Sequence, residues 1–117
     1  MHRFILALSC FLMVLAAPIS AQDFQKGLEA YENGDYATAL KEWKPLAERG
    51  NSEAQHWLGN MYNFGKGVHK NYKEAAKGYK LATEQGNLNA QSSLRLLYRV
   101  GHVLVLVSVF LGIIRSP

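Results

Sequence analysis

An internal repeat constrains the fold of this chain more than any other feature of its sequence. Residues 35–62 and 71–98 are offset by 36 positions and share eleven identities in 28 positions, where about two are expected by chance. The repeated pairs include Gly50-Asn51 with Gly86-Asn87 and Ala54-Gln55 with Ala90-Gln91. A period in the thirties is typical of stacked helical hairpins, so the sequence predicts an all-α fold. Its expected architecture is a short α/α superhelix (solenoid) of helix–turn–helix repeats.

Local signals predict one helix over residues 52–64. Apolar side chains recur there at the i, i+3, i+4, i+7 and i+8 spacing of a single helical face. Ser52 with Gln55 has the spacing of a capping box at the start of this helix. Gly65 and Gly67 are expected to end it, because glycine adopts left-handed backbone angles without strain.

Similar signals place the other helices of the repeats. Residues 23–33 and 36–49 are expected to form the first hairpin, with a bend at Pro45, which removes a backbone hydrogen bond. Asn71 is expected to cap the following helix, which ends near Gly86.

The predicted core combines small and aromatic side chains at helical spacing. Alanines let the helices approach closely, and aromatic rings fill the gaps between hairpins. The expected core residues are Ala39, Ala54, Ala75 and Ala90 with Trp43, Trp57, Tyr62 and Tyr79. We expect Trp57 to be an anchor whose truncation to alanine unfolds the domain.

Residues 54–68 resemble the Sel-one-like repeat, a relative of the tetratricopeptide repeat. They carry the pattern A-x-x-x-L-G-x-x-Y-x-x-G-x-G-V, and residues 71–86 continue the match. The resemblance covers about residues 22–101, as two hairpins and the first helix of a third. It implies an α/α superhelix that holds partner proteins together, often in bacterial secretion, envelope or signalling contexts. The first unit is shorter and resembles a tetratricopeptide-type repeat.

The first 21 residues have the order of a secretory signal peptide. Arg3 gives a basic start, an apolar stretch runs to Leu15, Pro18 interrupts it, and Ala21 supplies a small residue for cleavage. Cleavage there also removes Cys10, the one cysteine of the chain. The sequence therefore predicts an exported protein, periplasmic or secreted.

The last segment, residues 102–117, loses the repeat pattern. Val103 stands where the repeat has Gly67, and ten of the twelve residues 103–114 are hydrophobic. A twelve-residue helix reaches about 18 Å, short of a hydrocarbon core of about 30 Å, so no membrane span is expected.

Three interpretations of this apolar tail remain open. It is a frameshifted or truncated repeat, a capping segment that folds back over the last helix, or a tail that dips into a membrane or binds a partner. In the third case the expected headgroup contacts are Arg95, Arg99 and Arg115.

No motif for catalysis or metal binding is present. After signal cleavage the histidines are His56, His69 and His102, without cysteine or carboxylate at ligand spacing. The sequence also lacks a nucleophile elbow, a phosphate loop and an H-E-x-x-H motif. We therefore expect a protein that is no enzyme and needs no metal or cofactor.

Two surfaces are candidate partner sites. The first is a concave groove formed by the first helix of each hairpin, acidic at one end, amide-rich in the middle and basic at the other. It comprises Gln25, Glu29, Glu32, His56, Asn60, Asn63 and Arg99. Amides there would hold an extended peptide backbone.

The second candidate surface is a basic patch on the convex side. Its members are Lys41, Lys44, Lys70, Lys73, Lys77 and Lys80. Such a patch attracts anionic lipid or polysaccharide, although glutamates are interspersed and a merely solvated face has the same pattern.

These features predict an exported, non-enzymatic helical-repeat protein that binds a protein or peptide partner in the cell envelope or outside the cell. The net charge is +4, but no nucleic-acid partner is expected without base-stacking motifs. One alternative is a truncated or frameshifted repeat fragment without independent function. Another is an accessory protein of the envelope surface, in weak contact with the membrane through the tail or the basic patch.

Overall fold

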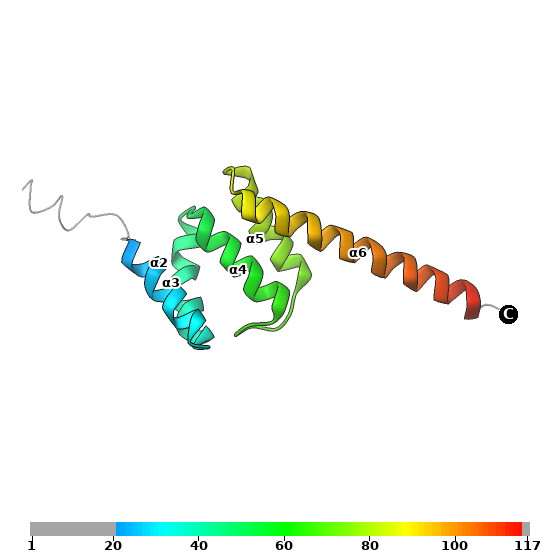
Figure 1. The fold of residues 1–117 in the computed structure, drawn as a ribbon, viewed down its shortest axis with the longest axis horizontal. Coiled ribbons are helices and arrows are strands. Elements are labelled where there is room, and N and C mark those ends of the chain that lie inside the picture. The colour runs from blue at the N-terminus through cyan, green and yellow to red at the C-terminus, as the bar shows by residue number, and fades with distance from the viewer. Residues whose placement is uncertain (1–20, 116–117) are drawn as a thin grey trace, which may run out of the picture.

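The computed structural model describes residues 21–115, which form five helices and, within that range, no strand. The helices are α2 (Ala21–Glu32), α3 (Tyr36–Glu48), α4 (Ser52–Phe64), α5 (Tyr72–Glu84) and α6 (Leu88–Arg115). Each helix packs on the next one along the chain, from α2 on α3 to α5 on α6 (Figure 1). The all-α prediction is therefore confirmed. The predicted signal peptide, apart from Ala21, lies outside the described residues.

Polar side chains start the helices, as expected, but one cap was assigned wrongly. The N-cap of α4 is Asn51, whose side chain accepts a hydrogen bond from the Ala54 N–H. Ser52 is instead the first helical residue. The predicted cap of α5 is correct: the Asn71 side chain accepts hydrogen bonds from the Lys73 and Glu74 N–H groups, both at 3.1 Å. Helix α3 contains Pro45 and continues through it to Glu48, while the expected bend stays a prediction.

The core lies between the first three helices and continues between α4 and α5. Trp43 is fully buried, and its indole N–H donates to the backbone oxygen of Phe24 at 3.1 Å. Trp57 stacks near it, with ring centroids 5.3 Å apart, but is only half-buried. Four core alanines are confirmed as fully buried: Ala39, Ala54, Ala75 and Ala90. Trp43 and Tyr79 are the fully buried aromatic side chains among those predicted for the core, whereas Trp57 packs against the core with part of its surface exposed.

Helices α4 and α5 approach each other closely where both carry glycine. A Cβ atom on Gly59 would lie 2.6 Å from the Tyr79 ring, and one on Gly78 would lie 2.8 Å from the Gln55 backbone oxygen. Since both distances are shorter than van der Waals contact, this crossing requires the two glycines.

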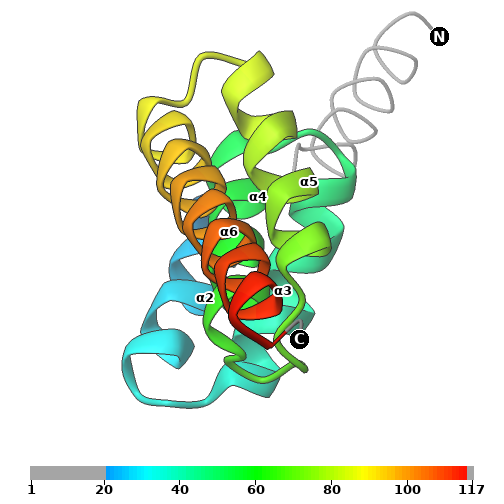
Figure 2. The ribbon, with the colours of Figure 1, turned by 90° about the vertical axis from the view of Figure 1, so that its right-hand side faces the viewer.

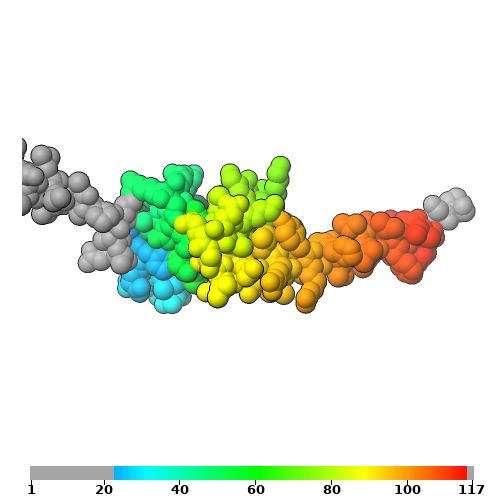
Figure 3. Space-filling view, turned by 90° about the horizontal axis from the view of Figure 1, so that it is seen from above, coloured from blue at the N-terminus to red at the C-terminus, as the bar shows by residue number. Residues whose placement is uncertain are grey.

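Helix α6 is unlike the other four. It runs for 28 residues without a break, packs on α5 with its first turns and then leaves the body of the protein (Figures 1 and 3). Every residue from Tyr98 to Arg115 is exposed. For the described residues 102–115, the interpretation as a cap folded back on the last helix is therefore wrong. The expected boundary after Gly101 corresponds to no break in the helix.

The continuity of α6 also corrects the exclusion of a membrane span. That exclusion considered only the twelve-residue apolar run, whereas the helix includes apolar residues before it. By length and composition, α6 is able to cross a membrane.

Candidate partner-binding surfaces

The predicted concave groove does not form one open surface. Its α2 members, Gln25, Glu29 and Glu32, are exposed, and so is Arg99 on α6. The three α4 members differ: His56 is 8% exposed, whereas Asn60 and Asn63 are half-buried. The middle of the expected groove is thus largely covered by neighbouring helices.

His56 and Asn60 belong to a polar cluster that joins α4 to α5 and α6. The Tyr79 hydroxyl donates to Asn60 Oδ1 at 2.7 Å, and His56 Nε2 lies 3.3 Å from Ser93 Oγ. Burial raises the pKa of Tyr79 above its ordinary value of 10, so the phenol stays protonated and remains a donor. One lone pair of Asn60 Oδ1 is therefore used by a buried tyrosine, and the role of Asn60 in peptide binding stays a prediction.

The electrostatics of His56 favour its neutral form. Burial lowers its pKa below the ordinary 6.5, and the negative charge of Glu53 opposes this shift. Among the residues that the structure describes, none forms a hydrogen bond with the second ring nitrogen, Nδ1. The hydrogen bonds of this cluster connect α4 to α5 and α6.

A groove does exist on another side of the molecule, across α3, α4 and α5. We call it the α3–α5 groove; its volume is about 400 Å³. Apolar and small residues form much of its lining: Leu40, Ala47, Leu58, Gly59, Tyr62, Gly78 and Leu81. Gln55 lies there as well, held by a hydrogen bond from its amide to the Ala47 carbonyl and by another from the Gln85 amide.

Charged residues of both signs line the α3–α5 groove. Lys44 and Glu48 come from α3, and Glu74 and Lys77 come from α5. Among the side chains that the structure describes, the one ion pair lies elsewhere, between Lys26 and Glu42 at 3.1 Å. The four charges in the groove are therefore not neutralised by direct pairing.

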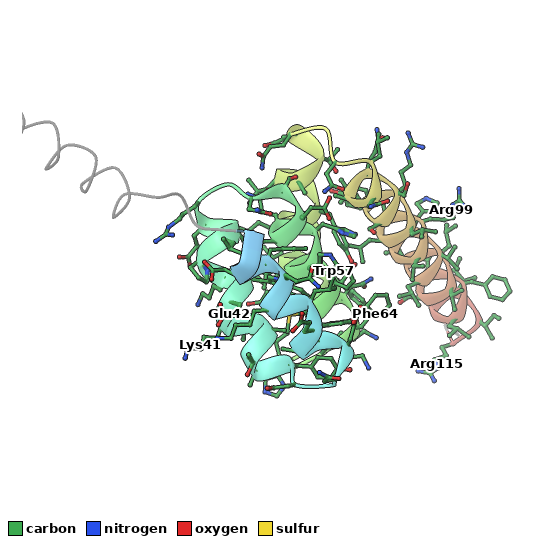
Figure 4. All side chains as sticks on the ribbon, turned by 60° about the vertical axis from the view of Figure 1, so that its left-hand side comes forward. Lys41, Glu42, Trp57, Phe64, Arg99 and Arg115 are labelled. Carbon is green, nitrogen blue, oxygen red and sulfur yellow. The ribbon has the colours of Figure 1, made fainter. Side chains whose placement is uncertain are left out.

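The predicted basic patch is divided between two grooves and open surface. All six lysines are exposed (Figure 4 labels Lys41). Lys44 and Lys77 line the α3–α5 groove, whereas Lys73 lines a second groove between α5 and α6. Two others lie over tyrosine rings: Lys70 Nζ is 5.2 Å from the Tyr72 centroid, and Lys80 Nζ is 5.9 Å from that of Tyr98.

The second groove, here the α5–α6 groove, has a volume of about 500 Å³ and an almost wholly apolar lining. Tyr72 and Ala76 line it from α5, and Leu97, Leu104 and Val105 line it from α6. It lies where α6 leaves the body of the protein.

Sequence reasoning missed the α3–α5 groove and the role of Gln55 in it. Gln55 was interpreted as part of a capping box, although it is buried and connects three helices. The available signal was the repetition of Ala54-Gln55 as Ala90-Gln91. In the part of the chain that the structure describes, no three metal-ligating side chains come together.

A comparison with models of known protein families finds no match, and a comparison with curated proteins finds none either. The likeness to the Sel-one-like repeat therefore depends on the motif in residues 54–68 and its continuation, and it stays a prediction.

Proposed function

We propose that the protein is a non-enzymatic helical-repeat protein of the Sel-one-like type, which binds a segment of a partner protein in the α3–α5 groove. The observation that carries the proposal is the groove itself, with its apolar lining and four charged side chains. A concave, mostly apolar site with a few polar groups is the usual form of a binding pocket.

Structural equivalence across the 36-residue offset supports the repeat assignment. Ala39 and Ala75 are both fully buried, and so are Trp43 and Tyr79. Two asparagines 36 residues apart make the same capping bond: the Ala54 N–H donates to Asn51 Oδ1 at 2.9 Å, and the Ala90 N–H donates to Asn87 Oδ1 at 2.9 Å.

The charges in the groove indicate the chemistry of its occupant. Lys44 and Lys77 attract acidic groups, but Glu48 and Glu74 repel the phosphates of nucleic acids and anionic lipids. A peptide segment with an apolar anchor flanked by charges of both signs satisfies all four side chains. The proposed partner is therefore a protein, met in the periplasm or outside the cell if residues 1–21 direct export.

Site-specific photocrosslinking tests this function. A photoreactive residue at position 81, where Leu81 lines the groove and is 42% exposed, should give a discrete adduct in cells that produce the full chain. Reversing two groove charges, Lys44→Glu with Lys77→Glu, should abolish the adduct. The matched control reverses Lys41 and Lys73, which lie on the same two helices but do not line this groove.

The outcomes separate the groove from general electrostatic attraction. Loss of the adduct in the groove variant alone supports the proposal. Equal loss in both variants would show that total positive charge, not the groove, recruits the partner. An adduct that survives both charge reversals would also reject the groove.

A further inference from the structure

The projecting part of α6 exposes an unusual amount of apolar surface. Ten large apolar side chains between residues 103 and 114 are each 48–68% exposed. They are Val103, Leu104, Val105, Leu106, Val107, Val109, Phe110, Leu111, Ile113 and Ile114. A surface of this kind marks a contact with a protein or with a membrane.

The apolar residues surround the helix. Five consecutive residues, Val103–Val107, are apolar and exposed, and five residues exceed one helical turn. A helix that docks in a protein groove or on a second copy is apolar on one face and polar on the other. The C-terminal half of α6 extends away from the other described helices (Figure 1), and Figure 2 looks nearly along this helix toward the body. An environment that is apolar on all sides is therefore required.

The length and the charges of α6 fit a lipid bilayer. Residues 97–114 contain one charged residue, Arg99, and Arg115 follows directly. These eighteen residues extend about 27 Å as a helix, against a hydrocarbon thickness of about 30 Å. Figure 4 shows Arg99 and Arg115 toward the two ends of the projecting segment, where long cationic side chains reach the headgroups.

The body of the protein carries interfacial residues where α6 leaves it. Tyr72 and Tyr98 line the α5–α6 groove and are 44% and 51% exposed. Lys73 lines the same groove, and Lys70 and Lys80 lie over the two tyrosine rings. Tyrosine and lysine are the side chains that favour the membrane–water interface and its anionic headgroups.

We propose that residues 97–114 cross a lipid bilayer, with the helical body at one surface and Arg115 at the other. Within the bilayer the continuous helix satisfies its own backbone hydrogen bonds. The α5 side of the α5–α6 groove then lies at the headgroups, and its distal α6 residues, Leu104 and Val105, lie in the hydrocarbon. This inference does not depend on the partner-binding proposal, which concerns the α3–α5 groove.

Fluorescent labels on α6 test whether lipid, protein or water surrounds this helix. The full chain with Cys10→Ser provides a cysteine-free background for single substitutions Leu104→Cys, Val105→Cys, Leu106→Cys and Val107→Cys. Each is labelled with a polarity-sensitive dye and reconstituted in vesicles of phosphatidylcholine and phosphatidylglycerol. All four labels should show blue-shifted emission and quenching by lipid-borne quenchers. Lys41→Cys, on the body, is the control, and a dye at this position should show the emission of a water-exposed label. Since the labels are on α6, insertion of residues 1–20 alone gives no signal.

Other occupants give different patterns. Protection of labels on one face only would mean a protein groove or a second copy, and four water-exposed labels would mean no insertion; either result overturns the proposal.

A second series tests whether α6 crosses the bilayer. Labels replace Val100, Val107 and Ile114 in the same background. A crossing helix places position 107 deepest and the other two near opposite interfaces. Depth that increases steadily to position 114 would mean that the helix ends inside the hydrocarbon, which contradicts a crossing.

Discussion

The chain turns after the end of α4, whereas the helix continues at the equivalent stretch of α6, 36 residues later. After Phe64 the chain turns through Gly65 and Gly67, with φ angles of +65° and +73°, and α5 folds back against α4. In α6, Gly101 takes the position of Gly65 but has no positive φ, and the helix continues. Val103 takes the position of Gly67, and a β-branched residue adopts such a φ only at a high cost. The loss of the Gly67 turn position is therefore one of the sequence changes that separate a hairpin from a projecting helix.

The difference determines what each region can bury. Because α5 folds back, it encloses Ala75, Tyr79 and Ala82, all fully buried. The distal part of α6 encloses nothing of the protein and gains no stability from it. The two regions should therefore respond differently to truncation, to turn substitutions, to acid and to helix propensity.

Truncation of a core ring should give the largest effect. Trp43→Ala removes a fully buried side chain and its hydrogen bond to Phe24, and should lower the free energy of unfolding by about 3–5 kcal/mol. Leu106→Ala, at a residue that is 55% exposed, should change it by less than about 0.5 kcal/mol. Urea unfolding followed by circular dichroism measures both. Similar losses in the two variants would mean that distal α6 packs on the body.

The turn substitution should rank second. Gly67→Val introduces the residue that α6 has at the equivalent position. A Cβ there would lie 2.7 Å from the Tyr36 Cβ, and the φ of +73° adds backbone strain. We expect a loss of about 3 kcal/mol, measured by the same unfolding assay. His69→Ala, at an exposed residue of the same connection, is the control and should unfold like the parent. An unchanged Gly67→Val variant would refute the explanation of why α6 continues.

Much of the difference between these two regions could be predicted from the sequence. The offset of 36 residues predicted the helices, the buried alanines and the turn at Gly65, because these depend on local spacing and on glycine geometry. The sequence also showed that Val103 replaces Gly67. It did not show the consequence, because a lost turn allows both a helix that continues and a chain that folds elsewhere.

The site was harder to predict, for a different reason. His56 and Asn60 were assigned to an open surface from their place on the helical wheel of α4. Whether that face is covered depends on how closely α5 and α6 approach it, and the spacing of residues within α4 contains no such information. The α3–α5 groove was missed because it exists only when three helices meet.

Acid should weaken the packed body through His56. Its pKa in the folded state is below the ordinary 6.5 because burial disfavours the charged ring. Between these two pKa values the unfolded chain binds more protons than the folded one. The contribution of His56 to stability is therefore fully present above about pH 6.5 and is lost progressively as the pH falls toward the folded-state pKa.

Thermal unfolding at several pH values checks this effect. The parent should lose stability between pH 7.5 and pH 5 by more than a His56→Gln variant, whose side chain does not titrate. His69→Gln, at an exposed histidine, is the matched control and should retain the pH dependence of the parent. If His56→Gln shows the same pH dependence as the parent, protonation of His56 does not contribute to the pH dependence of stability.

The smallest expected effect tests whether Gly101 retains any tendency to form the turn that Gly65 forms. A Cβ added at Gly101 meets no atom within 4 Å, and its φ is not in the left-handed region. Gly101→Ala should therefore stabilise the helix locally by about 0.5–1 kcal/mol, because alanine loses less backbone entropy than glycine. Gly65→Ala should do the reverse, since alanine is strained at the φ of +65°. Hydrogen exchange at the amides of residues 98–105, compared in the same vesicles for parent and variant, should become slower in Gly101→Ala. Faster exchange there would mean that Gly101 acts as a hinge. The turned and the continuous helical conformations would then both be populated at this position of α6, and α6 would not be permanently unbroken.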